Sequence, residues 1–144
     1  RFTISPELNK ETILDLTSSN TEVLASELIV YGKTPLMNMN YCLLGKANKC
    51  YPNCDTKCNS CNKYYLKDRL GLNFEIIPDN IQTVTTIYNS KITSIEHKDV
   101  AVDSVRIDAL DESVDELNSI IDTVKSGKKL EGSDYTNGNF NRYI

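Results

Sequence analysis

The start of the chain alternates strand-like apolar runs with one helical segment. Arg1–Ser5 predicts the end of a strand, a helix is expected over Asn9–Ser18, and Glu22–Tyr31 ends in a second strand stopped by Gly32. Strand, helix and strand within about 30 residues form a βαβ pattern, which requires a crossover and therefore predicts parallel strands.

The second half of the chain is richer in β-branched and aromatic residues and predicts mostly strands. These are expected over Leu72–Ile77, over Thr83–Ile95 in two pieces broken at Asn89-Ser90, and over Val100–Leu110 with Val105 among its inward residues. The chain is therefore expected to belong to the α/β class, with a mixed α+β character in the isolated segment.

A helix over about residues 111–126 is predicted to close this second half. Ser113 and Glu116 fit a capping box, and Gly127 stands where a left-handed C-cap is wanted. The inward positions of this helix are expected to be Val114, Leu117, Ile121 and Val124.

All five cysteines lie in one stretch, whose spacing is Cys42-x7-Cys50-x3-Cys54-x3-Cys58-x2-Cys61. The residues between them are polar and turn-forming, whereas isolated structural cysteines behave as small buried hydrophobes. Soft thiolates suit zinc and iron–sulfur clusters, and short loops between ligands let one segment surround one ion. The stretch therefore predicts a metal site held by four of the five cysteines. The irregular spacing does not decide which metal is bound.

Two other interpretations of the cysteines stay open. Disulfides would suit a small secreted domain, but the number of cysteines is odd and we expect no secretory leader. The thiols could also simply be unpaired. With the metal site taken as the organising feature, three segments are expected: residues 1–40, 41–65 and 66–144.

Composition and charge narrow the functional classes. The net charge of −4 argues against a general polyanion binder, and no apolar run approaches the roughly 18 residues of a membrane span. We therefore expect that the protein does not associate with a membrane and that it is located in the cytoplasm. Because a strand-like run follows Arg1 at once, the chain is expected to be part of a longer protein. An exposed strand edge in the isolated segment would favour self-association.

The cysteine stretch is locally basic. Six basic residues lie between Lys46 and Arg69, against Asp55 and Asp68. These cations either balance the charge of a thiolate site or, together with tyrosines such as Tyr64, contact the phosphates and bases of RNA.

Hydrolytic machinery is not evident. His97 is the only histidine and lies in a charged turn, with no motif of a nucleophile and a base around it. Neither an H-E-x-x-H zinc helix nor a Gly-rich phosphate loop is present.

A series of motifs runs through nearly the whole chain. The central motif is Glu27–Met37, followed by Tyr41-Cys42, and the others are Ser5–Leu8, Leu66–Arg69, Ile87–Ser90, Arg106–Asp108 and Gly138–Arg142. In this order they resemble the U32 peptidase family, whose members are often named collagenase-like proteases. The last motif departs from the family's Gly-His-Phe-x-Arg-Gly, because Asn139 replaces the histidine and Tyr143 the glycine.

The resemblance implies the last βα units of a TIM-like barrel, then a cysteine-rich loop and a mainly β portion with its closing helix. The upstream half of the barrel would be its partner within the same protein. By position, Cys42, Cys54 and Cys58 resemble the cluster ligands of the family, and either Cys50 or Cys61 could be the fourth. We expect zinc in the isolated segment, handled in air, or a [4Fe–4S] cluster in the full-length protein.

Two functions follow from the resemblance. The first is part of a peptidase of the U32 family with a cysteine metal site. The alternative is a cluster-carrying, substrate-docking segment of an enzyme that hydroxylates RNA or a quinone precursor without oxygen. An RNA or a peptide would be the substrate, and this segment alone is not expected to be catalytic. The sequence assigns no role to Glu7, Glu27 or Asp68.

Overall fold

A computed structural model describes residues 1–19, 24–50, 53–54, 58, 63–79 and 81–142. In this part of the chain, three helices accompany a mainly β, open sheet, so the mixed α/β class is confirmed. The chain forms two compact units: unit 1 comprises residues 1–33 and 91–144, and unit 2 comprises residues 34–90. The sequence-based segments, with boundaries after residues 40 and 65, stay a prediction, since they separate a loop from its neighbours rather than one compact body from another.

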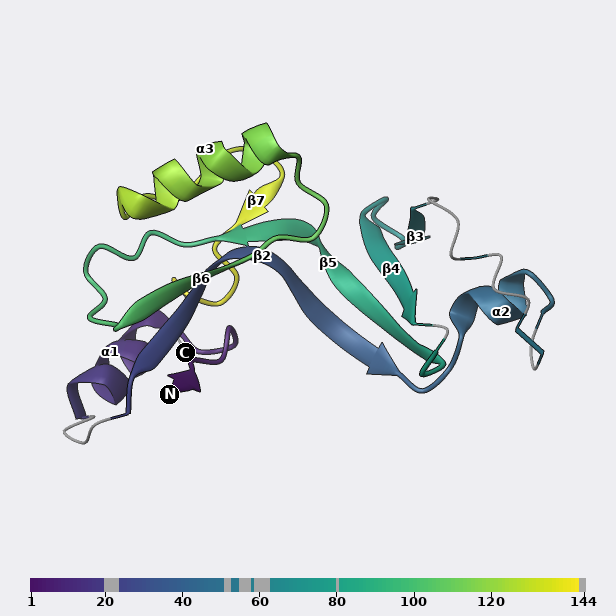
Figure 1. The fold of residues 1–144 in the computed structure, drawn as a ribbon, viewed down its shortest axis with the longest axis horizontal. Coiled ribbons are helices and arrows are strands. Elements are labelled where there is room, and N and C mark those ends of the chain that lie inside the picture. Colours follow the sequence, from purple (N-terminus) through teal and green to yellow (C-terminus); the bar gives the residue numbers. More distant parts are fainter. Residues whose placement is uncertain (20–23, 51–52, 55–57, 59–62, 80, 143–144) are drawn as a thin grey trace. The chain divides into compact units, whose positions relative to one another are not determined.

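Unit 1 begins with the predicted βαβ arrangement (Figure 1). β1 (Phe2–Thr3) pairs in parallel with β2 (Ser26–Met39), and α1 (Lys10–Ser19) connects them. Asn9 caps α1, because its Oδ1 accepts a hydrogen bond of 2.9 Å from the backbone N–H of Thr12. The prediction of parallel strands is therefore confirmed.

The prediction that the second strand stops at Gly32 is wrong, because β2 continues to Met39. Gly32 has a φ of +140°, and a Cβ built there would lie 2.5 Å from the carbonyl oxygen of Asp108. The glycine therefore permits a close approach of two strands instead of ending one of them.

β6 (Ser104–Asp108) lies parallel to β2, with Leu28 opposite Val105 and Gly32 opposite Asp108. The prediction that Val105 points inward is wrong, since this side chain is 38% exposed. Among the described strands, β6 pairs with β2. A strand with one neighbour shields its side chains from solvent less than a central strand does, which explains the exposure of Val105.

α3 (Val114–Lys125) follows β6 in the chain (Figure 1). Its two ends have the predicted capping residues. Ser113 and Glu116 form the capping box, and Gly127 has a φ of +72°. The inward face differs at its start, because Val114 is 76% exposed while Ile120 and Val124 are buried. Val114 is the first residue of the helix and lies beyond the part of α3 that covers the core.

One hydrophobic core fills unit 1. It combines side chains from β1, α1, β2, α3 and the C-terminal segment, and that segment also adds the short β7 (Tyr135–Thr136), which pairs with β5 (Val84–Ser94). The buried members are Ile4, Ile13, Leu28, Val30, Tyr31, Ile95, Val100, Ile120, Val124 and Phe140. All of them belong to unit 1.

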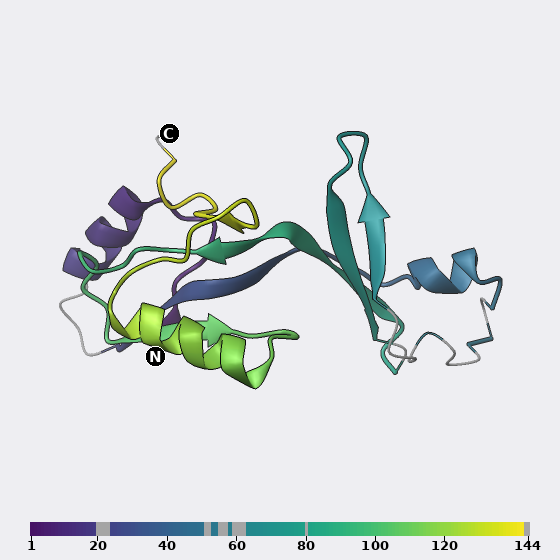
Figure 2. The same cartoon turned by 90° about the horizontal axis from the view of Figure 1, so that it is seen from above.

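Unit 2 contains α2 (Leu43–Ala47) and an antiparallel hairpin of β3 (Tyr64–Lys67) and β4 (Asn73–Asp79), which Figure 2 shows with its tight turn. β4 pairs in turn with β5. The predicted break at Asn89-Ser90 is wrong, because β5 is one continuous strand. Extended backbone accommodates both polar residues, and the boundary between the units falls directly after Ser90.

None of the helices in the described part of the chain is both long and apolar enough to cross a membrane.

Candidate functional site

The cysteine segment starts at the N-terminus of α2. Cys42 has an extended backbone, and its Sγ accepts a hydrogen bond from the backbone N–H of Gly45 at 3.1 Å. Beyond the helix, the N–H of Cys50 donates to the carbonyl of Gly45 at 2.9 Å. Two cysteines are thus held to the same short turn of helix.

Cys58 is the buried member of the set, with 6% of its surface exposed. Burial is the main cause that raises the pKa of the Cys58 thiol. The charge of Cys42 raises this pKa further, and those of Cys54 and Cys50 do so more weakly, whereas a hydrogen bond to the backbone of Cys58 lowers it. Cys42, Cys54 and Cys50 therefore lie within electrostatic reach of Cys58. No disulfide joins them.

Ligating geometry is a stricter condition than electrostatic proximity. Among the described residues, no three Cys, His, Asp or Glu side chains are arranged so that they could hold a metal ion. Cys61 lies outside the described residues, so the prediction that four of five cysteines converge is not tested. The donor set fits zinc or an iron–sulfur cluster in its chemistry, since all of its members are thiols.

A second group of candidate residues comes together in unit 1. Glu27, on β2, is paired with Arg106, on β6, at 3.3 Å and with Arg1 at 3.2 Å, and its side chain is 14% exposed. Arg106 also makes two hydrogen bonds to Asp108, of 2.7 and 2.9 Å, which raise its pKa. Thr3 Oγ1 donates to Glu27 at 3.0 Å. The motifs around Glu27 and around Arg106 are therefore one cluster.

Sequence reasoning named these motifs but did not connect them. The two motifs are connected by the parallel register of β2 and β6, which places Ile29 opposite Arg106 and brings the Arg106 guanidinium close to Glu27. The cluster is an ion-pair network on a partly exposed sheet, and it leaves no carboxylate without a cationic or hydroxyl partner.

The two other acidic residues have local roles. The carboxylate of Asp68 accepts hydrogen bonds from the backbone N–H groups of Leu70 at 2.8 Å and Leu72 at 2.9 Å. These bonds close the turn of the β3–β4 hairpin. Glu7 is exposed in a turn, where its N–H faces Ser5 Oγ at 3.3 Å.

His97 has no catalytic environment in the described part of the chain. Its Nδ1 lies 3.4 Å from the carbonyl oxygen of Ile95, and no nucleophilic side chain of the described residues is hydrogen-bonded to the imidazole. This agrees with the expectation of a turn histidine.

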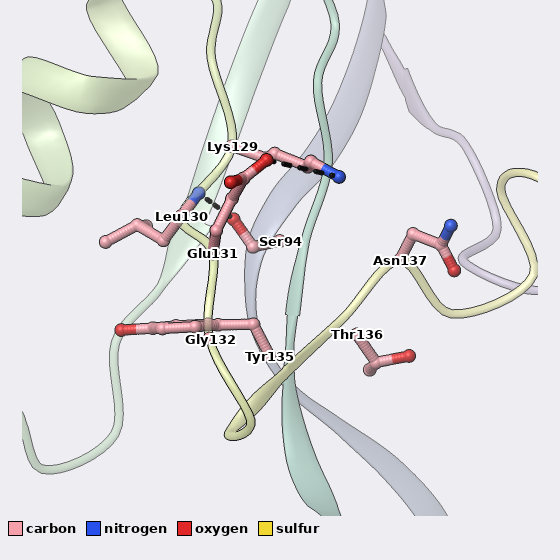
Figure 3. A pocket seen from close by; sticks show the side chains of 8 residues that line it. All are labelled: Ser94, Lys129, Leu130, Glu131, Gly132, Tyr135, Thr136 and Asn137. Atoms are coloured by element: carbon pink, nitrogen blue, oxygen red, sulfur yellow. Dashed lines mark hydrogen bonds and ion pairs between the residues drawn. The ribbon is translucent and has the colours of Figure 1, made fainter.

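A pocket of about 360 Å³ opens in unit 1 (Figure 3). Lys129 and Glu131 form an ion pair of 3.7 Å at its rim, and Ser94 Oγ accepts a hydrogen bond of 2.8 Å from the N–H of Leu130. In Figure 3 the side chain of Thr136 points away from Tyr135, so the polar groups do not converge on one point. None of the residues predicted from the sequence as site residues lines it.

The terminal motif is used for packing. Phe140 is buried in the core of unit 1, and its carbonyl accepts a hydrogen bond of 2.8 Å from the N–H of Lys10. The side-chain oxygen of Asn139 accepts a hydrogen bond from Arg142 at 3.4 Å.

No protein-family model, curated protein or solved structure matches the chain. The family resemblance therefore rests on the motifs alone.

Proposed function

We propose that the chain is part of a peptidase of the U32 family and that unit 2 carries its cysteine-bound metal centre. Zinc occupies this centre in the isolated segment, and a [4Fe–4S] cluster occupies it in the full-length protein. The ligands are four of the five cysteines Cys42, Cys50, Cys54, Cys58 and Cys61.

The small core of unit 2 is the observation that carries the proposal. Its buried hydrophobic side chains, among the described residues, are Leu44, Cys58, Ile76 and Ile87, and one of these is itself a thiol. Units below about 70–80 residues rarely reach a stable core without a disulfide, a metal or another crosslink. Since no disulfide joins the described cysteines, a thiolate-bound metal is the crosslink that these residues can supply.

The surroundings of the thiols support the same conclusion. Burial raises the pKa of the Cys58 thiol, and a metal ion that replaces the thiol proton would compensate the charge of the buried sulfur. A reducing compartment keeps such thiols available, which is why we place the protein in the cytoplasm.

Unit 1 supports the barrel part of the proposal. β1, β2 and β6 are successive parallel neighbours, and helices follow β1 and β6, as in the βα units of a barrel. In this proposal the upstream barrel half covers the free edge of the sheet, and the isolated segment associates with itself when that half is missing.

An alternative role is supported by the β3–β4 hairpin. Tyr65 is 49% exposed on this hairpin, and neither Lys67 nor Arg69 has an ion-pair partner in the described part of the chain. An exposed aromatic ring on the same hairpin as two cations suits the docking of an anionic substrate such as RNA. In that case the segment belongs to an oxygen-independent hydroxylating enzyme rather than a peptidase, and the absence of a nucleophile hydrogen-bonded to His97 among the described residues favours it.

Metal analysis tests the proposal directly. Freshly purified protein should contain zinc or iron, and the anaerobically purified full-length protein should show the visible spectrum of a cluster. Hydrogen exchange supplies an internal comparison: a chelator should strip protection from the amides of β4 in unit 2 and leave those of α3 in unit 1 protected. Absence of both metals, with all five thiols freely reactive, rejects the metal centre.

Activity distinguishes the two roles. Digestion of gelatin or casein by highly purified full-length protein, lost on removal of one named side chain, would establish the peptidase. Hydroxylation of an RNA base or a quinone precursor under anaerobic conditions would establish the alternative. The segment by itself is expected to do neither.

A further inference from the structure

A cavity of about 380 Å³ opens in unit 1 between the start of α1 and the C-terminal segment. These two segments lie side by side (Figure 2), and the N–H of Lys10 donates to the carbonyl of Phe140 at 2.8 Å. The volume falls in the range of about 300–1,000 Å³ that is usual for small-molecule sites. The described residues that line the cavity all belong to unit 1, whereas the cysteines belong to unit 2.

Two apolar side chains line this cavity. Leu14, on α1, is half-buried, and Phe140 belongs to the hydrophobic core of unit 1 with 4% of its surface exposed. Packing in the core fixes the Phe140 ring, so the cavity has an apolar surface that exists before any ligand arrives. Such a surface suits the hydrocarbon part of a small molecule.

Asn9 supplies a hydrogen-bond donor to the same cavity. It is 7% exposed, and its Oδ1 caps α1 by accepting from the N–H of Thr12 at 2.9 Å. Its Nδ2 has no hydrogen-bond partner among the described residues. In this part of the chain, every fully buried polar side-chain atom has a partner, so Nδ2 must keep contact with solvent. Because Asn9 lines the cavity, a ligand there can accept from these unused N–H groups.

The charged residues that line the cavity are Lys10, Arg142 and Glu11. Lys10 is already partly neutralised, since its Nζ lies 3.5 Å from Asp99. Arg142 is exposed, makes one hydrogen bond of 3.4 Å to Asn139, and has no ion pair with another described residue. Arg142 is therefore the cation that remains for a ligand. Its planar guanidinium matches the geometry of a carboxylate.

We propose that this cavity binds a small organic acid that has an apolar body and one carboxylate. The carboxylate accepts hydrogen bonds from Arg142 and from the amide of Asn9, and the apolar body packs against Leu14 and Phe140. Glu11 repels a second negative charge, so the site selects a monoanion over a dicarboxylate or a phosphate ester. The inference goes beyond the proposed function and involves no metal.

The test is a titration of the full chain with phenylpropionate, followed through the chemical shifts of the backbone amides. We expect saturable binding with a Kd on the order of 1 mM, which is usual for a ligand of this size. The largest shifts should occur at the amides of Lys10, Leu14 and Phe140. Phenylpropanol has the same body without the charge and should bind at least about 10-fold more weakly, because charge-assisted hydrogen bonds are lost.

Three variants locate the site. Asn9→Asp keeps a capping oxygen for α1 but replaces the donor of the amide by a second carboxylate oxygen, and Arg142→Gln removes the cation. Each substitution should weaken the binding of phenylpropionate by at least about 10-fold. Lys125→Gln is the matched control, because Lys125 is an exposed cation of α3 that does not line the cavity. This variant should bind as the wild type does.

Several results would overturn the inference. No saturable shift at roughly 20 times the expected Kd rejects the site. Wild-type affinity in Arg142→Gln or in Asn9→Asp rejects the proposed contacts, and equal affinity for phenylpropanol rejects the carboxylate. Should Asn9→Asp fail to fold, as judged by the amide shifts of α3, Arg142→Gln alone decides.

A second acid separates a free ligand from a peptide end. N-acetylphenylalanine has its carboxylate at the end of a peptide-like chain. Weaker binding of this compound than of phenylpropionate supports a small free acid as the ligand. Tighter binding overturns that assignment in favour of the C-terminus of a peptide.

Discussion

The hydroxyl of Tyr31 donates a hydrogen bond of 2.9 Å to Glu112, which is 81 positions further along the chain. The other oxygen of Glu112 accepts from the backbone N–H of Leu110 at 2.7 Å and from that of Asp111 at 3.1 Å. A fully buried phenol on β2 therefore holds the loop that leads into α3.

This pair makes the stability of unit 1 sensitive to alkaline pH. Burial, followed by the hydrogen bond and the charge of Glu112, raises the pKa of Tyr31 above its ordinary value of 10.0. The folded state thus holds the phenolic proton more tightly than the unfolded state does. The stabilisation is complete below pH 10.0 and is lost as the pH rises above it.

Tyr31→Phe is expected to lower the free energy of unfolding by about 2 kcal/mol at neutral pH, since a hydrogen bond to a charged group is lost. The variant should also lose the part of the alkaline decline that Tyr31 contributes. Urea unfolding between pH 8 and pH 11 measures both effects, at roughly unit intervals of pH. Tyr65→Phe, at an exposed position, is the control and should match the wild type. An unchanged pH profile in Tyr31→Phe would contradict the prediction.

Gly32→Ala should destabilise the chain strongly. A Cβ at this position would lie 2.5 Å from the carbonyl oxygen of Asp108, at a φ of +140° that side chains rarely adopt. We expect a loss of about 2–4 kcal/mol from backbone strain and overpacking together. Thermal unfolding is the measurement. Gly71→Ala is the matched control, because its φ of +86° is also strained but its nearest atom is 3.8 Å away, and it should cost only about 1 kcal/mol.

The capping box of α3 gives a smaller expected change. Ser113 Oγ accepts from the N–H of Glu116 at 3.3 Å, and the Glu116 carboxylate accepts from the N–H of Ser113 at 2.8 Å. Ser113→Ala should therefore cost about 1 kcal/mol in urea unfolding. Ser119→Ala, at an exposed position inside the same helix, should be neutral or slightly stabilising. Equal effects of the two substitutions would argue against the cap.

Cysteine replacement should reveal the ligand set. Cys54→Ser is expected to lower the zinc content per chain, since its position resembles a ligand of the family, and one of the five single variants should keep the wild-type content. Plasma emission spectrometry on protein purified in parallel gives the zinc content. Five variants that all retain full zinc content would show that the cysteines are not the ligands.

Local patterns predicted α1, α3 and the parallel start well, but not the short helix α2. Asn9 and Ser113 cap their helices through contacts that span three residues, so the information lies within a short window of sequence. The prediction at Gly32 was wrong because the residue that explains this glycine, Asp108, is distant in the sequence. Residue propensity predicted that the strand ends at Gly32, whereas in the structure packing against Asp108 accompanies a strand that continues to Met39.

The candidate site also has features that the sequence predicted and features that only the structure reveals. The sequence identified the five cysteines by their density, and their convergence on a metal stays a prediction. It also marked Glu27 and Arg106 separately, but their ion pair depends on the register between β2 and β6, which periodicity alone does not specify.

The chain leaves unit 1 after Lys33 and returns to it at Lys91, and both points lie inside strands that are neighbours in the sheet, β2 and β5. The sequence of unit 2 therefore lies between two stretches of the sequence of unit 1. A change in the length or composition of residues 34–90 therefore substitutes none of the buried residues of the unit 1 core.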